Sequence, residues 1–166
     1  LLQRGFNVGA LYRPFNNRAF DRRYRTVMER GGGRLFARGR AGMAGMVRHL
    51  RAGGVLGVLH DQHMDRGVEL RFFGKPAMTA TSAADLALKY DALLVPFYGI
   101  RKPDGLHFDL ITEAPVAHSD AVTMTQALND SLEARVRAHM GQWIWTHRRW
   151  KTRRRGGRAN ARLKHS

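Results

Sequence analysis

The sequence predicts an α/β fold in which helices flank a layered, mainly parallel sheet. Short apolar runs that are typical of buried parallel strands alternate along the chain with segments whose apolar residues have helical spacing. A strong turn signal, Lys-Pro-Asp-Gly at 102–105, joins the last two expected strands. The order strand, helix, strand, helix, strand, helix, strand, strand, helix therefore favours a parallel sheet with one antiparallel edge.

The strands are expected to be short. The run 55–59 is continuously apolar, as in strands that are covered on both faces. Segment 106–112 instead alternates side chains from one face to the other. The expected strands are 6–12, 35–36, 55–59, 93–100 and 106–112.

The expected helices begin and end at recognisable signals. Asn17 is a suitable N-cap, and three consecutive glycines follow at 31–33. In 41–52, Met43, Met46 and Leu50 have helical spacing and are expected to fill the core. The expected helices are 17–30, 41–52, 81–90 and 119–140.

Length and composition predict one domain over residues 1–152, followed by a basic, disordered tail over 153–166. No run of 18 apolar residues is present, so membrane contact is expected to be peripheral or to depend on a segment upstream of Leu1. Because the chain opens without Met inside an apolar element, we expect it to be truncated at its front.

The net charge of +16 indicates an anionic partner, because such a charge attracts polyanions. Most of it comes from arginine, which binds phosphate through two parallel hydrogen bonds. Charge alone leaves nucleic acid, anionic lipid and an acidic carrier protein open. The absence of cysteine excludes disulfides and thiolate metal sites.

Three places in the sequence could carry chemistry. Arg13 follows the first expected strand. A loop is expected from His60 to Pro76 after the apolar strand 55–59, and it opens with the polar residues His60 to Asp65. His60 and Asp65 have His-x4-Asp spacing, but chance predicts roughly 0.6 such pairs in this composition, and a metal at His60, His63 and Asp65 is a weaker alternative. Finally, segment 142–151 holds all three tryptophans, which are expected to pack inward while Arg148, Arg149 and Lys151 face an anion or lipid headgroups.

Several motifs in order give a specific resemblance. The sequence resembles the bacterial lipid A biosynthesis (lauroyl/myristoyl) acyltransferases, and only the C-terminal portion of that family, without its N-terminal anchor and His-x4-acid motif. The resemblance implies a partial glycerolipid-acyltransferase-like fold, and it makes the His60/Asp65 spacing a coincidence. The motifs that carry it are Tyr-Arg-Pro-Phe-Asn-Asn at 12–17, Asp-Gln at 61–62, Phe-Phe-Gly-Lys-Pro-Ala at 72–77, Leu-Val-Pro at 94–96, Arg-Lys-Pro-Asp-Gly at 101–105 and Gln-Trp-Ile-Trp-Thr-His-Arg-Arg-Trp-Lys at 142–151.

The resemblance implies transfer of a fatty acyl chain from acyl carrier protein to a hydroxyl of an acylated, phosphorylated glucosamine disaccharide. It places that reaction at the cytoplasmic face of the inner membrane, and it implies no metal and no cofactor beyond the thioester of the carrier. The expected partners are acyl carrier protein, the lipid A precursor and the cytoplasmic leaflet, with no specific nucleic acid. This chain alone is expected to be inactive.

The resemblance also suggests roles for individual residues. Arg13 and Asp61 are expected to support catalysis, and Arg13 also to bind an acceptor phosphate or the developing oxyanion. The residues expected to contact substrate are Arg13, Gln62, Phe72, Phe73, Gly74, His147, Arg148 and Arg149. Arg13, Asp61 and the segment 72–74 are expected to converge on one open side of the sheet.

Two other functions compete with this interpretation. A basic nucleic-acid-binding module is favoured by the charge, the arginine tail and the interleaved tryptophans. A small hydrolase that uses His60 and Asp65 lacks a Gly-x-Ser-x-Gly nucleophile turn.

Overall fold

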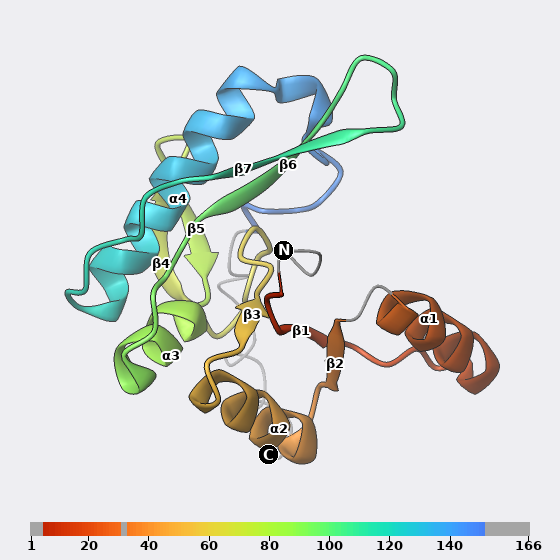
Figure 1. The fold of residues 1–166 in the computed structure, drawn as a ribbon. Helices are drawn as coiled ribbons and strands as arrows, with labels where there is room; N and C mark the ends of the chain where they lie inside the picture. Colours follow the sequence, from red (N-terminus) through yellow and green to blue (C-terminus); the bar gives the residue numbers. More distant parts are fainter. Residues whose placement is uncertain (1–4, 31–32, 152–166) are drawn as a thin grey trace, which may run out of the picture. The chain divides into compact units, whose positions relative to one another are not determined.

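The computed structural model describes residues 5–30 and 33–151, which form two compact units (Figure 1). The first unit comprises the residues up to Leu59 together with Leu86–Ala92, and the second comprises His60–Asp85 and the residues from Leu93 onward. The predictions of one domain over 1–152 and of a disordered tail are not decided by this division. The tail lies outside the described residues.

The first unit contains the expected parallel sheet. Its strands are β1 (Val8–Tyr12), β2 (Arg34–Ala37) and β3 (Val55–Gly57), in the order β2-β1-β3. Strand β1 pairs parallel with both β2 and β3. Helix α1 (Arg18–Arg30) lies between β1 and β2 in the sequence, and helix α2 (Arg40–Arg51) lies between β2 and β3. The predicted α/β class is therefore confirmed.

Helix α2 packs on this sheet through a buried histidine. His49 donates from Nε2 to the carbonyl oxygen of Val55 at 3.1 Å, which ties the end of α2 to the start of β3. A Cβ at Gly54 would come within 2.4 Å of the His49 ring, so glycine is required at this close approach. Met46 is buried as expected, whereas Met43 is 40% exposed, so only part of the predicted apolar face of α2 reaches the core.

Helix α1 begins as the sequence predicts but packs differently from α2. The side chain of Asn17 accepts hydrogen bonds from the backbone N–H groups of Ala19 and Phe20, which is an N-cap. None of the helix residues is buried. Figure 1 shows α1 next to the edge strand β2 and separate from α2.

The second unit begins with a hairpin that the sequence analysis missed. Strands β4 (Val68–Phe72) and β5 (Lys75–Thr79) pair antiparallel, and all of β4 and the start of β5 lie in the segment 60–76 that was expected to be a loop. The turn consists of Phe73 and Gly74, both of which have positive φ angles, 53° and 69°. Two such residues form the tight turn that matches the twist of paired strands. The signal that was missed is the alternation of inward- and outward-facing side chains on both sides of a turn that contains neither Asn nor Asp.

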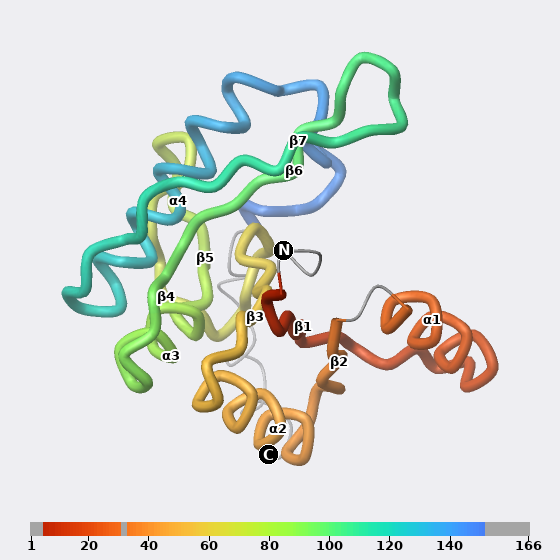
Figure 2. The backbone as a smooth tube through the Cα atoms, in the orientation of Figure 1, coloured from red at the N-terminus to blue at the C-terminus, as the bar shows by residue number. Residues whose placement is uncertain are grey.

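A second hairpin corrects the predicted sheet. Strands β6 (Phe97–Arg101) and β7 (Phe108–Thr112) pair with each other, and β6 does not join the parallel sheet among the described strands. The expected turn at 102–105 is present, since the N–H of Gly105 donates to the carbonyl oxygen of Lys102. Figure 2 shows the two strands running side by side into this turn. Residues 97–100 of the apolar run 93–100 therefore belong to a two-stranded ribbon.

Helix α4 (Ala121–Ala138) organises the second unit. Asp120 caps it by accepting hydrogen bonds from the N–H groups of Val122 and Thr123. The helix packs on β4, and its buried residues are Met124, Thr125, Leu128, Asn129 and Val136. A short 3-10 turn, η2 (Met140–Gln142), follows, whereas helix α3 (Ser82–Tyr90) contributes residues to both units. The four helices were thus predicted to within two residues at most ends.

Candidate active site

The closing segment of the described chain is anchored by Arg149, whose side chain is completely buried. Its Nη1 donates to the carbonyl oxygen of Met78 at 2.9 Å, and its Nη2 donates to Oγ1 of Thr79 at 2.6 Å. Nη2 also lies 3.3 Å from Oδ1 of Asn129 on α4. The guanidinium stands over the ring of Phe72, 5.3 Å from its centre.

Asn129 connects Arg149 to the residue just before Asp61. Its Nδ2 donates to the carbonyl oxygen of Arg71 at 3.1 Å, which fixes the orientation of the amide. Oδ1 therefore accepts both from Arg149 and from Nε2 of His60, which lies 3.2 Å away. Because an amide oxygen only accepts, His60 must carry its proton on Nε2.

The electrostatics of this cluster depend on burial. Burial lowers the pKa of Arg149, and the negative charge of Asp61 opposes that shift. Burial also lowers the pKa of His60, its hydrogen bond to Asn129 opposes the shift, and the positive charge of Arg149 adds to it. His60 is therefore held neutral at physiological pH. Among the described residues, no carboxylate forms an ion pair with Arg149.

The structure contradicts two expectations, one for the surroundings of Arg149 and one for those of Phe72. Arg149 was expected to face an anion or lipid headgroups, but its Nη1 and Nη2 atoms donate to the protein itself. Phe72 was expected in a loop beside a substrate pocket, but it is the fully buried last residue of β4. Both side chains are buried inside the second unit. Their neighbours Arg148 and Phe73 are exposed and partly exposed, respectively.

Phe73 holds a backbone conformation that is unusual for a bulky residue, with φ at 53°. Its N–H donates to the carboxylate of Glu133 on α4, and the guanidinium of Arg137 lies 4.5 Å from its ring centre. Such contacts are what a strained turn requires in order to persist. The Phe73–Gly74 turn is therefore a defined feature of the surface.

The tryptophans pack inward only in part. Trp150 stacks on Phe72 with ring centres 5.6 Å apart, and its Nε1 donates to the Phe72 carbonyl oxygen. Trp143 also packs against Phe72, but Trp145 remains 46% exposed. Two of the three rings are thus committed to the core, which disfavours the nucleic-acid-binding alternative, because base stacking requires exposed aromatic faces.

The histidines of the polar loop do not converge on one metal. His63 pairs through Nε2 with Asp65 at 2.9 Å, and its backbone N–H donates to Nε2 of His147 at 3.3 Å. His60 points instead to Asn129. Within residues 5–30 and 33–151, no group of three or more potential ligands could hold a metal ion. His147 therefore joins the closing segment to the loop that carries Asp61 and Gln62.

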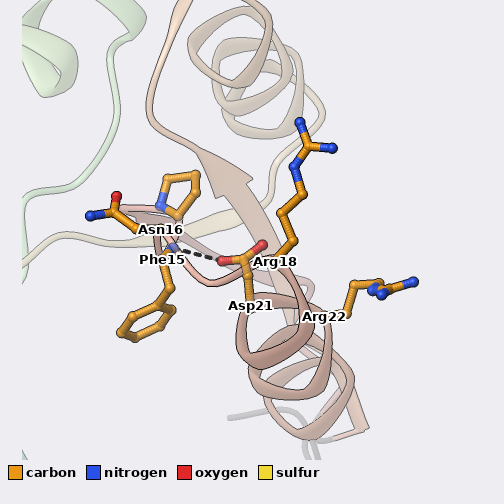
Figure 3. A pocket seen from close by; sticks show the side chains of 6 residues that line it. Phe15, Asn16, Arg18, Asp21 and Arg22 are labelled. Atoms are coloured by element: carbon orange, nitrogen blue, oxygen red, sulfur yellow. Dashed lines mark hydrogen bonds between the residues drawn. The ribbon is translucent and has the colours of Figure 1, made fainter.

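Arg13 belongs to the first unit, in the exposed turn between β1 and α1. Beside this turn lies a hollow of about 580 Å³, lined by Pro14, Phe15, Asn16, Arg18, Asp21 and Arg22 (Figure 3). Asp21 shapes it by accepting a hydrogen bond from the N–H of Phe15 at 2.9 Å. The second unit holds the other expected site residues, so their convergence with Arg13 stays a prediction.

The sequence analysis missed Asn129 and assigned no role to Thr79. The signal for Asn129 is that an amide stands on the apolar face of a helix, one residue after Leu128 and seven before Val136. A polar side chain in that position must find partners inside the protein. Thr79 gives no comparable signal.

Known proteins match the chain over most of its length. A family model described as "Bacterial lipid A biosynthesis acyltransferase" matches residues 1–152. The chain is 34% identical over 120 residues to the "Lipid A biosynthesis lauroyltransferase" of Escherichia coli, and 26% identical over 121 residues to the "Lipid A biosynthesis acyltransferase" of Haemophilus influenzae. Each alignment covers 69% of this chain and 39% of the relative.

The chain thus spans about two fifths of the length of these curated relatives. No helix in the described ranges combines the length and the hydropathy that crossing a bilayer requires. The family model covers the strand, the loop and the closing segment that carry Arg13, Asp61 and Arg149. The chain belongs to the bacterial lipid A biosynthesis acyltransferase family.

Proposed function

We propose that the protein transfers a fatty acyl chain from acyl carrier protein to a hydroxyl of an acylated, phosphorylated glucosamine disaccharide in lipid A biosynthesis. The observation that carries the proposal is the family match over residues 1–152. The reaction takes place at the cytoplasmic face of the inner membrane, where the acceptor is embedded and the carrier protein is dissolved.

The site residues have the chemistry that this reaction needs. Arg13 supplies a cation for an acceptor phosphate or for the developing oxyanion. Asp61 and Gln62 supply an acid and an amide beside the neutral His60. The unit that contains Asp61 also contains His147, Arg148 and the Phe73–Gly74 turn. The buried side chains of Phe72 and Arg149 pack inside that unit.

An acyl transfer assay tests the proposal. Residues 1–152 replace the matching segment of the Escherichia coli lauroyltransferase, and transfer of a labelled acyl chain from acyl carrier protein to the disaccharide is measured. The chimera is expected to transfer the chain, and D61N should slow it about 10²-fold or more if Asp61 supports charge in the transition state. E69Q, which changes an exposed carboxylate on β4, is the matched control.

Two results would count against this function. One is a chimera that folds by circular dichroism yet transfers no acyl chain. The other is a D61N rate equal to that of E69Q. The 166-residue chain alone is expected to be at least two orders of magnitude slower than the chimera, because it spans only about two fifths of the length of its curated relatives.

A further inference from the structure

One side of α1 is apolar and exposed. Phe20, Tyr24, Val27 and Met28 have the spacing i, i+4, i+7 and i+8, so they share one face of the helix. Phe20 is 53% exposed, Val27 55% and Met28 47%. Phe15 extends this face, since its ring lies edge-on to those of Phe20 and Tyr24 at 4.8 and 5.0 Å. Tyr24 is partly buried, and no residue of the helix is fully buried.

The rest of α1 is strongly basic. Its 13 residues include five arginines, and its two carboxylates are already engaged. Asp21 accepts hydrogen bonds from the N–H of Phe15 and the hydroxyl of Tyr12, and Glu29 pairs with Arg25 at 3.2 Å. Among the described residues, no carboxylate pairs with Arg18, Arg22 or Arg23. Figure 3 shows Arg18 and Arg22 extending away from Asp21 in different directions.

We propose that α1 is an interfacial helix that binds the surface of an anionic lipid bilayer. Its apolar face enters the boundary between headgroups and acyl chains, and its unpaired arginines bind lipid phosphates. An anionic bilayer surface thus matches both the apolar face and the positive charge of the helix. A nucleic acid would use the arginines but leave Val27 and Met28 in water. A protein groove without acidic residues would cover the apolar face but give the arginines no counter-charge.

This inference deepens the proposed function by naming the surface of the chain that meets the membrane. It rests on that function only for the presence of an anionic bilayer near the site. Lipid binding is measured without acyl transfer, so either proposal can fail while the other stands.

The first experiment uses the fact that the chain has no cysteine. V27C and T26C, on the apolar and polar sides of α1, each carry one environment-sensitive fluorophore in the 166-residue chain. With vesicles of phosphatidylglycerol and phosphatidylcholine, the label on V27C is expected to shift to shorter emission wavelength, and the label on T26C to remain unchanged. Equal responses of the two labels would overturn the proposal, because adsorption by charge alone would not distinguish the faces.

The second experiment measures vesicle affinity by co-sedimentation. F20S and V27S are each expected to weaken binding about ten-fold, because each removes apolar surface from the bilayer. R22Q should weaken it about five-fold, and the loss should fade at high salt. The controls are L106S, at a site that is 81% exposed in the other unit, and R66Q, in an exposed loop. Controls that lose as much affinity as the α1 variants would contradict an interfacial role for α1.

Other occupants of the face give distinct results. Self-association would appear as a V27C emission shift that grows with protein concentration and needs no lipid. Nucleic acid binding would appear as R22Q-sensitive binding of an oligonucleotide at physiological salt, with vesicles inert. Either result would overturn the assignment, whereas a lipid-dependent shift at constant protein concentration supports it.

Discussion

Helices α1 and α4 use the same residue types for opposite purposes. Both begin with an Asx cap and both carry arginines near their C-terminal ends. In α4, five residues are buried, among them Asn129, whereas α1 has none. The apolar side of α4 completes a core, and the apolar side of α1 is left for a partner.

The same contrast separates the arginines. Arg149 is completely buried and all of its hydrogen bonds end on the protein, while Arg18 and Arg22 extend into the open beside the hollow of Figure 3. Net charge therefore does not predict which arginines meet an anion. Burial and available acceptors decide the role of each arginine.

The largest expected effect concerns Arg149. R149Q removes the Nη donors to Met78, Thr79 and Asn129, so each of these acceptors loses one hydrogen bond from a charged group inside the protein. We expect the free energy of unfolding to fall by about 3 kcal/mol in urea denaturation. R148Q, at the exposed neighbour, should change it by less than about 0.5 kcal/mol. Equal losses in the free energy of unfolding of R149Q and R148Q would contradict the contrast between a buried and an exposed arginine.

Asn129 offers the next largest effect. N129A removes hydrogen bonds to Arg149, His60 and the Arg71 carbonyl oxygen, and should cost about 2 kcal/mol. V27S on α1 should cost less than about 0.5 kcal/mol, because Val27 is exposed. In the double variant with R149Q, the losses should fall short of additivity by at least about 0.5 kcal/mol. Strict additivity would show that the two side chains do not act as a unit.

His60 sharpens the comparison through pH. Its pKa is lower in the folded than in the unfolded protein, so the unfolded state binds more protons as the pH falls. Its neutral form therefore stabilises the fold fully at pH above the ordinary imidazole pKa of about 6.5, and that stability is lost as the pH falls below it. Urea denaturation between pH 8 and pH 5 should show a smaller decline for H60Q than for the unaltered chain. A steeper decline in H60Q would refute the assignment.

The smallest effect is expected at the surface ion pair of α1. R25A removes a pair in which both side chains are more than 40% exposed. The expected loss is about 0.3–0.5 kcal/mol and should vanish in high salt. Thermal unfolding at two salt concentrations measures it. A loss above about 1 kcal/mol would mean that α1 is held more tightly than its exposure indicates.

The helices and the parallel sheet could be predicted because their signals are local. Asn17 caps the helix that it was expected to begin, Asp120 caps the helix that was expected over 119–140, and the run at 55–57 pairs as a parallel strand. The β4–β5 hairpin could not, because its turn places Phe73 at positive φ, a conformation that sequence favours only for Gly, Asn or Asp. Tertiary contacts from α4 stabilise that turn instead.

The sequence predicted which positions belong to the candidate site, but not which of their side chains are buried and which are exposed. Motif order identified Asp61, His147 and Arg149, but nothing local distinguishes Arg148, which is exposed, from Arg149, which is buried. That difference depends on acceptors 70 residues away, at Met78 and Thr79. Long-range pairing of this kind leaves no trace in spacing or composition.

The affinity of R149Q and of R22Q for anionic vesicles tests the contrast between buried and exposed arginines most directly. Both variants lose one positive charge, so electrostatic attraction that depends only on net charge would weaken equally in the two. The measurement is made without urea, at a temperature where both variants are folded. R22Q is then expected to bind the vesicles about five-fold more weakly than the unaltered chain, and R149Q to bind them as well as the unaltered chain does. Vesicle affinity that falls as far in folded R149Q as in R22Q would contradict the account.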